Sequence, residues 1–395
     1  MTSEWRTIRA ADFIDFNPRL SLKKGDIATK VAMDKLKPFT KKIPETEKAE
    51  FNGGAKFCNG DTVMARITPC LENGKTAFVD MLDDGEIGFG STEFIVMRAK
   101  TGISDPQFVY YTAINPVFRN VAIKSMVGSS GRQRVQQSVL EELELSVPDL
   151  DEQRRIGDFL ARIDEKIALN DRINDNLEQQ AQAIYHERFE TASPDDLHSG
   201  WRTVTLGEVA TILNKSFNPL KEPEMLLEHY SIPAFDEARF PVFDLSTSIK
   251  SNKFIIDASC FMISKLNPTT KRVWKPYCLT GNAVCSTEFI VYKAKDKTIT
   301  DFLYSVIDSN SFSDFMCSHV TGSTGSRQRT TPSDTLSYEL ILPSEDDLAE
   351  FHSLVSPMYA QIRINAIEND RLKRLRDSLL PKLMSGEIDV FTIQL

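Results

Sequence analysis

The hexapeptide STEFIV occurs twice in this chain, as residues 91–96 and again as residues 286–291. The two copies are 286 − 91 = 195 residues apart in a chain of 395 residues. Six identical residues repeated at nearly half the chain length indicate an internal duplication. Because a long fixed period decides the whole architecture, the rest of the sequence is best compared at this offset.

Other segments match at about the same spacing. GSSGRQR at residues 128–134 returns as GSTGSRQR at 322–329, and LELSVP at 143–148 returns as YELILP at 338–343. Near the two starts, WRTI at 5–8 parallels WRTV at 201–204. The sequence therefore predicts a tandem repeat of two similar halves.

Each half opens with a mixture of strand and helix signals. In the first half, residues 62–67, 75–79 and 93–97 are short β-type runs bounded by Gly-containing turns. Residues 106–114 have the pattern of a helix, and residues 300–307 are their counterpart. These signals predict an α+β globule in each half.

A long amphipathic segment follows each globule. Its apolar residues recur at steps of four and three, which is the pattern of a coiled-coil helix. The seam comprises Ile156, Leu160, Ile163, Ile167, Leu177, Ala181 and Ile184 in the first copy, and Phe351, Val355, Met358, Ile362, Leu372 and Leu379 in the second. At about 1.5 Å per residue, each helix would be roughly 50 Å long.

Both seams are interrupted by asparagine, at Asn170 and Asn174 in the first helix and at Asn365 and Asn369 in the second. If the helices are antiparallel, Asn170 faces Asn369 and Asn174 faces Asn365. A buried polar pair of this kind disfavours other registers and the parallel arrangement. The alternative is that these asparagines face solvent.

A net charge of −9 by itself argues against a nucleic-acid partner, but this charge is not evenly distributed along the chain. Residues 1–148 carry 20 basic and 19 acidic side chains, and residues 201–343 carry 15 of each, so most of the acidity lies in the helices and linker. Arginine can bind guanine and glutamine can bind adenine through two hydrogen bonds. The alternative is that the arginine-containing loops are ordinary surface turns. The candidate DNA contacts are Lys23, Lys24, Lys41, Lys42, Arg132, Gln133, Arg134, Lys271, Arg272, Trp274, Lys275, Arg327, Gln328 and Arg329.

No catalytic motif is apparent. Glu93 and Glu288 recur within STEFIV, but neither has a neighbouring acid in sequence, so a carboxylate hydrogen-bonded within the repeated strand is favoured over a general acid or base. The six cysteines and five histidines show no metal-ligand spacing. The chain has neither an apolar run of membrane-spanning length nor an apolar N-terminal stretch, and we expect it to be cytoplasmic.

This arrangement resembles the specificity subunits of Type I restriction–modification systems. The resemblance covers the whole chain, and it depends on the duplicated Gly-Ser/Arg-Gln-Arg loops and on segments of both helices. Those segments are Val147-Pro148 with Glu152, Gln153 and Ile156, then residues 173–178, 181–185 and 375–386. The second helix opens SEDDLAE, where the family usually shows a Glu-Gln pair.

The resemblance implies an α+β protein with two target-recognition domains, related by a pseudo-twofold and separated by two antiparallel coiled-coil helices. The boundaries would be domain 1 at 1–148, helix 1 at 149–190, a linker at 191–200, domain 2 at 201–343, helix 2 at 344–385 and a tail at 386–395. The chain would be a non-catalytic subunit that reads an asymmetric, gapped site in double-stranded DNA and binds no cofactor.

The same resemblance implies partners that supply the chemistry. Two copies of a modification subunit would methylate DNA with S-adenosylmethionine, and restriction subunits would use ATP and Mg²⁺. Two alternatives remain at this point: a coiled-coil adaptor with no role at DNA, and an enzyme that uses Glu93 and Glu288.

Overall fold

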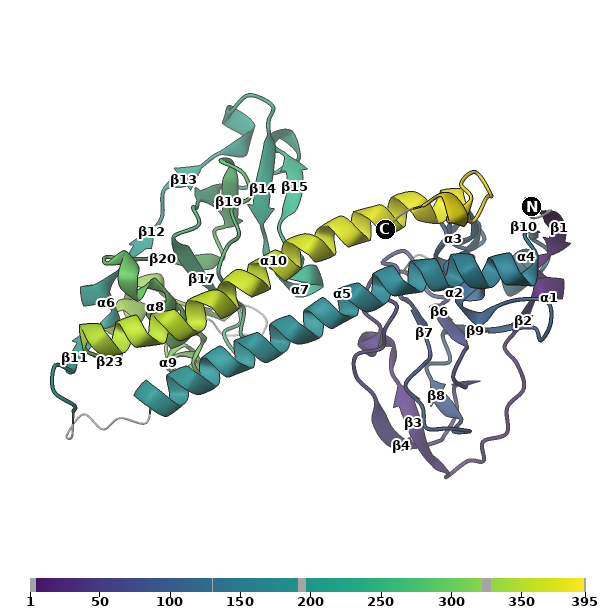
Figure 1. Ribbon diagram of the computed structural model, residues 1–395, viewed down its shortest axis with the longest axis horizontal. Coiled ribbons are helices and arrows are strands. Elements are labelled where there is room, and N and C mark those ends of the chain that lie inside the picture. Colours follow the sequence, from purple (N-terminus) through teal and green to yellow (C-terminus); the bar gives the residue numbers. More distant parts are fainter. Residues whose placement is uncertain (1–4, 130, 191–196, 322–327, 394–395) are drawn as a thin grey trace. The chain divides into compact units, whose positions relative to one another are not determined.

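The computed structural model describes residues 5–129, 131–190, 197–321 and 328–393. The chain divides into two compact units, the first made of Met1–Leu169 and Glu368–Leu395 and the second of Asn170–Ile367 (Figure 1). Both units combine helices with strands, which confirms the α+β class.

The first unit contains two four-stranded sheets, ordered β2-β9-β6-β7 and β4-β3-β8-β5, and the antiparallel pair β1-β10. Its strands are β1 (Arg6–Arg9), β2 (Ile14–Phe16), β3 (Ile27–Val31), β4 (Glu47–Glu50), β5 (Ala55–Phe57), β6 (Thr62–Ala65), β7 (Thr76–Phe78), β8 (Gly88–Gly90), β9 (Phe94–Ala99) and β10 (Glu144–Val147). Its short helices are α1 (Ala10–Phe13), α2 (Pro106–Ile114), α3 (Pro116–Lys124) and α4 (Gln137–Glu141).

The second unit contains a four-stranded sheet, β12-β20-β17-β18, a five-stranded sheet, β13-β16-β19-β14-β15, and the pairs β11-β23 and β21-β22. Its strands are β11 (Arg202–Thr205), β12 (Ala210–Leu213), β13 (Ser216–Phe217), β14 (Leu226–Tyr230), β15 (Val242–Leu245), β16 (Lys253–Ile255), β17 (Cys260–Ser264), β18 (Val273–Trp274), β19 (Ala283–Ser286), β20 (Phe289–Ala294), β21 (Val320–Thr321), β22 (Arg329–Thr330) and β23 (Glu339–Leu342). Its short helices are α6 (Leu206–Val209), α7 (Ile232–Ala238), α8 (Thr300–Asp308) and α9 (Asn310–Ser318).

The two units share one topology. The order β2-β9-β6-β7 corresponds to β12-β20-β17-β18, and in each unit a strand from the first part of the repeat pairs with the strand that precedes the long helix. Among the described residues, each unit also has one parallel strand pair, β3 with β8 and β14 with β19. The sequence duplication is therefore a duplication of the fold.

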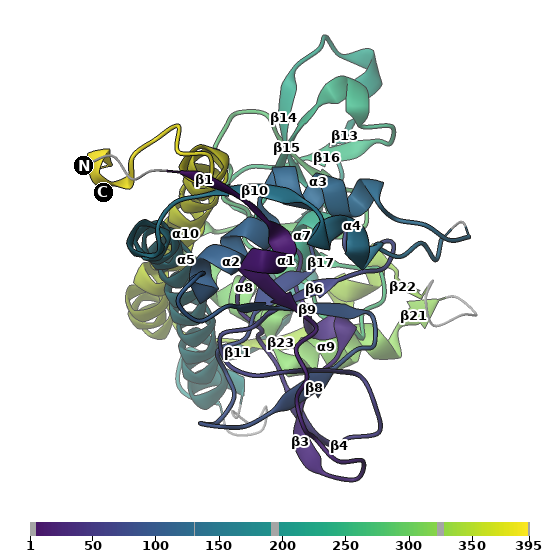
Figure 2. The ribbon, with the colours of Figure 1, turned by 90° about the vertical axis from the view of Figure 1, so that its right-hand side faces the viewer.

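Helix α2 shows how local sequence builds the core of the first unit. Pro106 occupies the first turn, where a missing N–H costs nothing, and the Asp105 side chain accepts a hydrogen bond from the Phe108 N–H as an N-cap. The helix packs on β6 and β9 (Figure 2). Tyr110 and Tyr111 are almost fully buried there, which makes α2 a core helix with no apolar face left to solvent.

The two long helices are α5 (Leu150–Tyr185, 36 residues), followed by a π-helical turn at His186–Glu190, and α10 (Glu345–Leu383, 39 residues). Each begins with a side-chain cap, because Asp149 Oδ1 accepts from the Glu152 N–H at 2.9 Å and Ser344 Oγ accepts from the Asp347 N–H at 3.2 Å. Each helix contributes residues to both units.

Within each unit the two helices run antiparallel. In the first unit, Arg376 pairs with Asp164 at 2.6 Å and Lys166 with Glu368 at 3.3 Å, so numbers rise along α5 as they fall along α10. In the second unit, Asn365 of α10 bonds Asn174 of α5, and Glu350 bonds Arg188, with the same opposed direction. Apolar seam residues join the core of each unit; those of the first unit include Ile156 and Leu160, with Leu379 packed against the same core. Leu380 and Leu383 of α10 also belong to this core, although they lie outside the predicted seam.

Candidate nucleic-acid interface

The two repeated motifs of the first half meet in space. Glu93 of STEFIV accepts a forked pair of hydrogen bonds from Arg134 of the GSSGRQR loop, with Nε at 2.9 Å from Oε2 and Nη2 at 2.6 Å from Oε1. The arginine side chain is 46% exposed and the glutamate 23% exposed. STEFIV and the loop are therefore two parts of a single surface feature.

Backbone hydrogen bonds hold this loop against the sheet. Arg134 exchanges N–H···O bonds with Val127, and the Gln133 carbonyl accepts from the Thr68 N–H at 3.0 Å. Arg66 links the loop to the strand end, because its N–H donates to the Glu93 carbonyl and its own carbonyl accepts from Val135, both at 2.9 Å. The arginine thus projects from a segment whose backbone is fixed on both sides.

The second unit contains the same construction. Arg329 donates from Nε and Nη2 to Glu288 at 2.9 and 3.2 Å. The Gln328 carbonyl accepts from the Asn267 N–H at 2.9 Å, and Lys265 bridges Glu288 and Thr330 through its backbone. Arg327 lies outside the described residues. We call these features the first and second reading clusters: Arg66, Glu93, Gln133 and Arg134, and Lys265, Glu288, Gln328 and Arg329.

The clusters correct the prediction for the two glutamates. Glu93 and Glu288 do not lie inside a strand, since β9 begins at Phe94 and β20 at Phe289. They bond an arginine of a distant loop rather than a group within the repeated strand. The hydrogen bond from Arg134 lowers the pKa of Glu93, which keeps the carboxylate charged. A general acid would need the opposite shift.

The sequence analysis did not identify Arg66 and Lys265, which belong to the first and second reading clusters. Both directly follow the central strand of their sheet, and both precede an apolar residue and an X-Pro step, in RITP at 66–69 and KLNP at 265–268. A basic residue before an apolar residue and an X-Pro step in both repeats was the sequence signal that could have identified these two residues. Its offset is 265 − 66 = 199 rather than 195 residues, which hid it in a comparison at fixed spacing.

Three of the predicted cationic contacts are exposed and form no ion pair with any described residue: Lys23, Lys24 and Arg132. Lys42 is exposed but pairs with Asp80. In a segment of nearly balanced charge such as residues 1–148, these cations are the groups best able to bind a phosphate.

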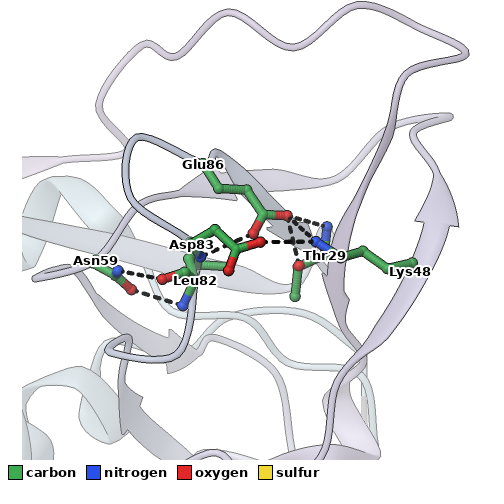
Figure 3. Close-up of polar contacts among 6 residues, drawn as sticks. All are labelled: Thr29, Lys48, Asn59, Leu82, Asp83 and Glu86. Atoms are coloured by element: carbon green, nitrogen blue, oxygen red, sulfur yellow. Dashed lines mark hydrogen bonds and ion pairs between the residues drawn. The ribbon is translucent and has the colours of Figure 1, made fainter.

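The hairpin that follows Lys23 and Lys24 is held by a carboxylate. Glu86 accepts from the Thr29 backbone N–H at 3.0 Å, from Thr29 Oγ1 at 2.6 Å and from Lys48 Nζ at 2.7 Å (Figure 3). The segment between β7 and β8, which carries Glu86, is itself fixed by Asn59, whose side chain forms paired hydrogen bonds with the Leu82 backbone (Figure 3). Burial opposes the charge of Glu86, but the bonds from Lys48 and Thr29 outweigh it and lower its pKa to about 2.

Lys41 does not belong to the interface. Its side chain is only 5% exposed, donates to Gln107 Oε1 and Tyr111 OH, and lies over the rings of Phe78, Tyr110 and Tyr111. Burial lowers the pKa of Lys41 to about 8. A lysine enclosed in this way cannot reach a phosphate, so the predicted DNA contact is wrong at this position.

Within the predicted cluster at 271–275, the structure contradicts a DNA contact at Trp274. Trp274 is 3% exposed and packs edge-on against Tyr230 and Phe235, so its ring is part of a core and cannot stack on a base. The three neighbouring cations are engaged in ion pairs: Lys271 with Asp308, Arg272 with Asp236 and Lys275 with Asp301. This basic run stabilises the second unit.

The asparagines of the helix seams are mostly buried. Asn170, Asn365 and Asn369 are 0%, 4% and 4% exposed, which excludes a solvent-facing role for these three. Within the second unit, Asn365 Nδ2 donates to Asn174 Oδ1 at 2.8 Å, the two residues that the antiparallel register places opposite each other. Within the first unit, Asn369 Nδ2 donates to the Ile167 carbonyl at 3.4 Å.

Two other properties concern only the part of the chain that the structure describes. In that part, no group of three or more histidine, cysteine or acidic side chains is arranged to hold a metal ion. No helix there combines the length and apolar character needed to cross a membrane.

Comparison with known proteins gives consistent matches. Residues 3–179 match the family described as "Type I restriction modification DNA specificity domain". The chain is 23% identical to the Type I restriction enzyme HindI specificity subunit of Haemophilus influenzae, over 83% of this chain and 86% of that protein. It is 36% identical over 129 residues to the EcoAI specificity subunit of Escherichia coli, which is 33% of this chain but 20% of that protein.

One solved structure is similar in fold. The S subunit of a Type-I restriction-modification system from M. genitalium aligns with a TM-score of 0.56 at 16% identity, over 96% of each chain. At this identity the likeness concerns the fold alone.

Proposed function

We propose that the chain is a specificity subunit of a Type I restriction–modification system and that it reads a bipartite site in double-stranded DNA. The match of residues 3–179 to the DNA specificity domain and the likeness to the HindI specificity subunit support this proposal. Each reading cluster contacts one half of the site. The observation that carries the proposal is the recurrence of one arginine–glutamate–basic cluster, built with the same backbone bonds, in both units.

The residue chemistry suits base recognition together with phosphate binding. The outer guanidinium edges of Arg134 and Arg329 have the geometry to bind guanine O6 and N7, and the neighbouring glutamines suit adenine. Lys23, Lys24 and Arg132 supply charge that positions the duplex without reading its sequence. The two halves of the site differ, because the units share topology but not side chains outside the repeated motifs.

We expect a gap of about 6–8 base pairs between the two half-sites. Helices of 36 and 39 residues measure roughly 54 and 58 Å at about 1.5 Å per residue. This length corresponds to about 16 base pairs at roughly 3.4 Å each, and the expected gap is what remains after two short half-sites are subtracted from it.

The reaction itself is carried out by partners. Two modification subunits, which bind S-adenosylmethionine, methylate the site, and restriction subunits that use ATP and Mg²⁺ cleave and translocate DNA. This chain binds none of these cofactors and directs both partners to the site. The acidic helices, not the nearly neutral segments 1–148 and 201–343, are the surface offered to the partners, since residues 149–200 carry 13 acidic against 6 basic side chains.

Methylome sequencing tests the proposal. A bacterial strain without other methyltransferases, expressing this chain with the modification subunit of its system, should acquire an asymmetric, gapped methylation motif. Exchange of residues 201–343 for the second domain of another specificity subunit should change one half of the motif and preserve the other half and the gap. A contiguous motif, or loss of both halves, would contradict the proposal.

Titration with salt separates the proposal from the adaptor alternative. DNA affinity of the complex should fall steeply with salt concentration, since each phosphate contact contributes about −0.9 to the slope of log K against log salt. If the chain binds its partner subunits but the complex shows no affinity for DNA at any salt concentration, the adaptor alternative is favoured.

A further inference from the structure

Both reading clusters bind their arginine through the same edge of the guanidinium group. Glu93 accepts only from Nε and Nη2 of Arg134, and Glu288 accepts only from Nε and Nη2 of Arg329. None of these contacts uses Nη1, and no other hydrogen bond among the described residues does so. With respect to the described part of the chain, the edge that carries Nη1–H and the outer Nη2–H is therefore open to a ligand in each unit.

The fork also fixes how that free edge is oriented. An arginine on a surface loop normally samples many rotamers, whereas two parallel N–H···O bonds hold the guanidinium plane in one orientation. The backbone of each glutamate is also anchored, because the Glu93 N–H donates to Ser91 Oγ at 3.1 Å and the Glu288 N–H donates to Ser286 Oγ at 3.2 Å. These serines are the first residues of the repeated STEFIV, which explains why the motif begins where it does.

The carboxylates have a second effect, on charge. An unpaired arginine attracts any phosphate, so it strengthens binding to all DNA sequences equally. With Glu93 beside it, Arg134 has almost no net charge to offer a phosphate but keeps two donors for the acceptors of a base. A charge-neutral fork thus favours hydrogen bonding to a base edge over ionic contact with the backbone.

From these contacts we propose that Glu93 and Glu288 are positioning residues for sequence selectivity, each presenting one arginine to a guanine and suppressing its binding to phosphate. The inference rests on the proposed DNA-reading function and assigns a role to the carboxylates of both repeats. It predicts one guanine-dependent position in each half-site, governed by a glutamate that does not itself touch the base.

The experiment uses the complete chain with its modification subunit and the substitutions Glu93→Gln and Glu288→Gln. The motif is read from enrichment of a random duplex library and from the methylome. Glu93→Gln should relax one base position in one half-site, with at least about a tenfold loss of discrimination, and Glu288→Gln should relax one position in the other half-site. Affinity for non-specific DNA should rise, and the salt slope should steepen by about 0.9 because one more phosphate contact forms.

Glu142→Gln is the matched control. Glu142 also accepts from an exposed arginine of the first unit, since Arg9 Nη1 donates to its two oxygens at 3.1 and 3.4 Å, but this pair lies outside the reading cluster. The control should leave the motif and the salt slope unchanged. Arg134→Lys keeps the charge and loses the fork, so it should relax the same position as Glu93→Gln.

The outcomes separate this inference from the function on which it rests. If the complex without any substitution selects no motif, the proposed function is wrong. If it selects a gapped motif that Glu93→Gln and Glu288→Gln leave intact, while only thermal stability falls, the glutamates are structural and the inference is overturned. Should Glu93→Gln fail to fold, Glu288→Gln and Arg134→Lys decide the question.

Discussion

Substitution of Asp164 should destabilise the first unit more than substitution of any exposed acid on the long helices. Asp164 and Arg376 are each 6% exposed, and they join α5 to α10 through a bond of 2.6 Å between Oδ1 and Nη1. The second carboxylate oxygen accepts from the Tyr111 hydroxyl at 2.6 Å, which connects the helix pair to the core helix α2. Asp164→Ala therefore leaves the buried guanidinium with Asp377, whose side chain is 62% exposed, as its remaining acidic partner.

The expected cost follows from that burial. Removal of one partner from a buried pair costs about 3–5 kcal/mol when the remaining charge is left uncompensated. Because Asp377 also pairs with Arg376, we expect Asp164→Ala to lie at the lower end of this range. Arg376→Met should cost a similar amount. The double variant Asp164→Leu with Arg376→Met should recover most of the loss, since two apolar side chains of similar size leave no isolated charge.

Urea denaturation of the complete chain, followed by circular dichroism and by tryptophan fluorescence, measures these differences. Trp5 belongs to the first unit and packs against its core, whereas Trp201 and Trp274 belong to the second unit, so the fluorescence reports on both units. Asp151→Ala is the control, because Asp151 is 71% exposed and pairs only with Arg154 on its own helix. A cost below about 1 kcal/mol for Asp164→Ala, or a double variant no more stable than the singles, would refute the reasoning.

Two further predictions concern pH. Burial lowers the folded-state pKa of Lys41 to about 8, whereas its ordinary value is 10.5, so the unfolded chain binds the proton more tightly. The cost of this burial to the free energy of unfolding is therefore full below pH 8 and disappears as the pH rises to 10.5. The stability of the unmodified protein should therefore gain up to about 3 kcal/mol relative to Lys41→Met across that window, as measured by urea denaturation; a constant difference would contradict the buried charge. Glu86 shows the opposite case, because a folded-state pKa of about 2 against 4.5 means that its contribution is present above pH 4.5 and is lost as pH falls towards 2. Glu86→Gln should cost about 1 kcal/mol at neutral pH, with the difference vanishing near pH 2 in thermal melts, and a difference that persists there would show that the hydrogen-bond geometry, not the charge, anchors the hairpin.

Several local elements could be predicted because short-range chemistry specifies them. Residues 106–114 were readable as a helix, since a proline at its start and an aspartate cap define the N-terminus, and the structure has α2 at those residues. The long helices were readable from the heptad spacing, and α5 and α10 begin directly after the two capping residues.

Side-chain roles were harder to predict because they depend on burial. Lys41 and Trp274 looked like DNA contacts in a one-dimensional scan for basic and aromatic residues. The structure places both in cores, where Lys41 lies among aromatic rings and Trp274 packs against Tyr230. Sequence carries no signal for which lysine of the pair Lys41 and Lys42 points inward.

The sequence by itself determined that the protein is a duplicated α+β chain with two heptad helices, because repeats and apolar periodicity are properties of residue order. It also determined which motifs recur. Only the tertiary structure decided that two of those motifs form one cluster, since Glu93 and Arg134 are separated by 41 residues and meet only when β9 and the following loop fold against the same sheet. Residue order specifies local conformation, whereas the partner of a charged side chain is chosen by the packing that brings distant backbone segments together.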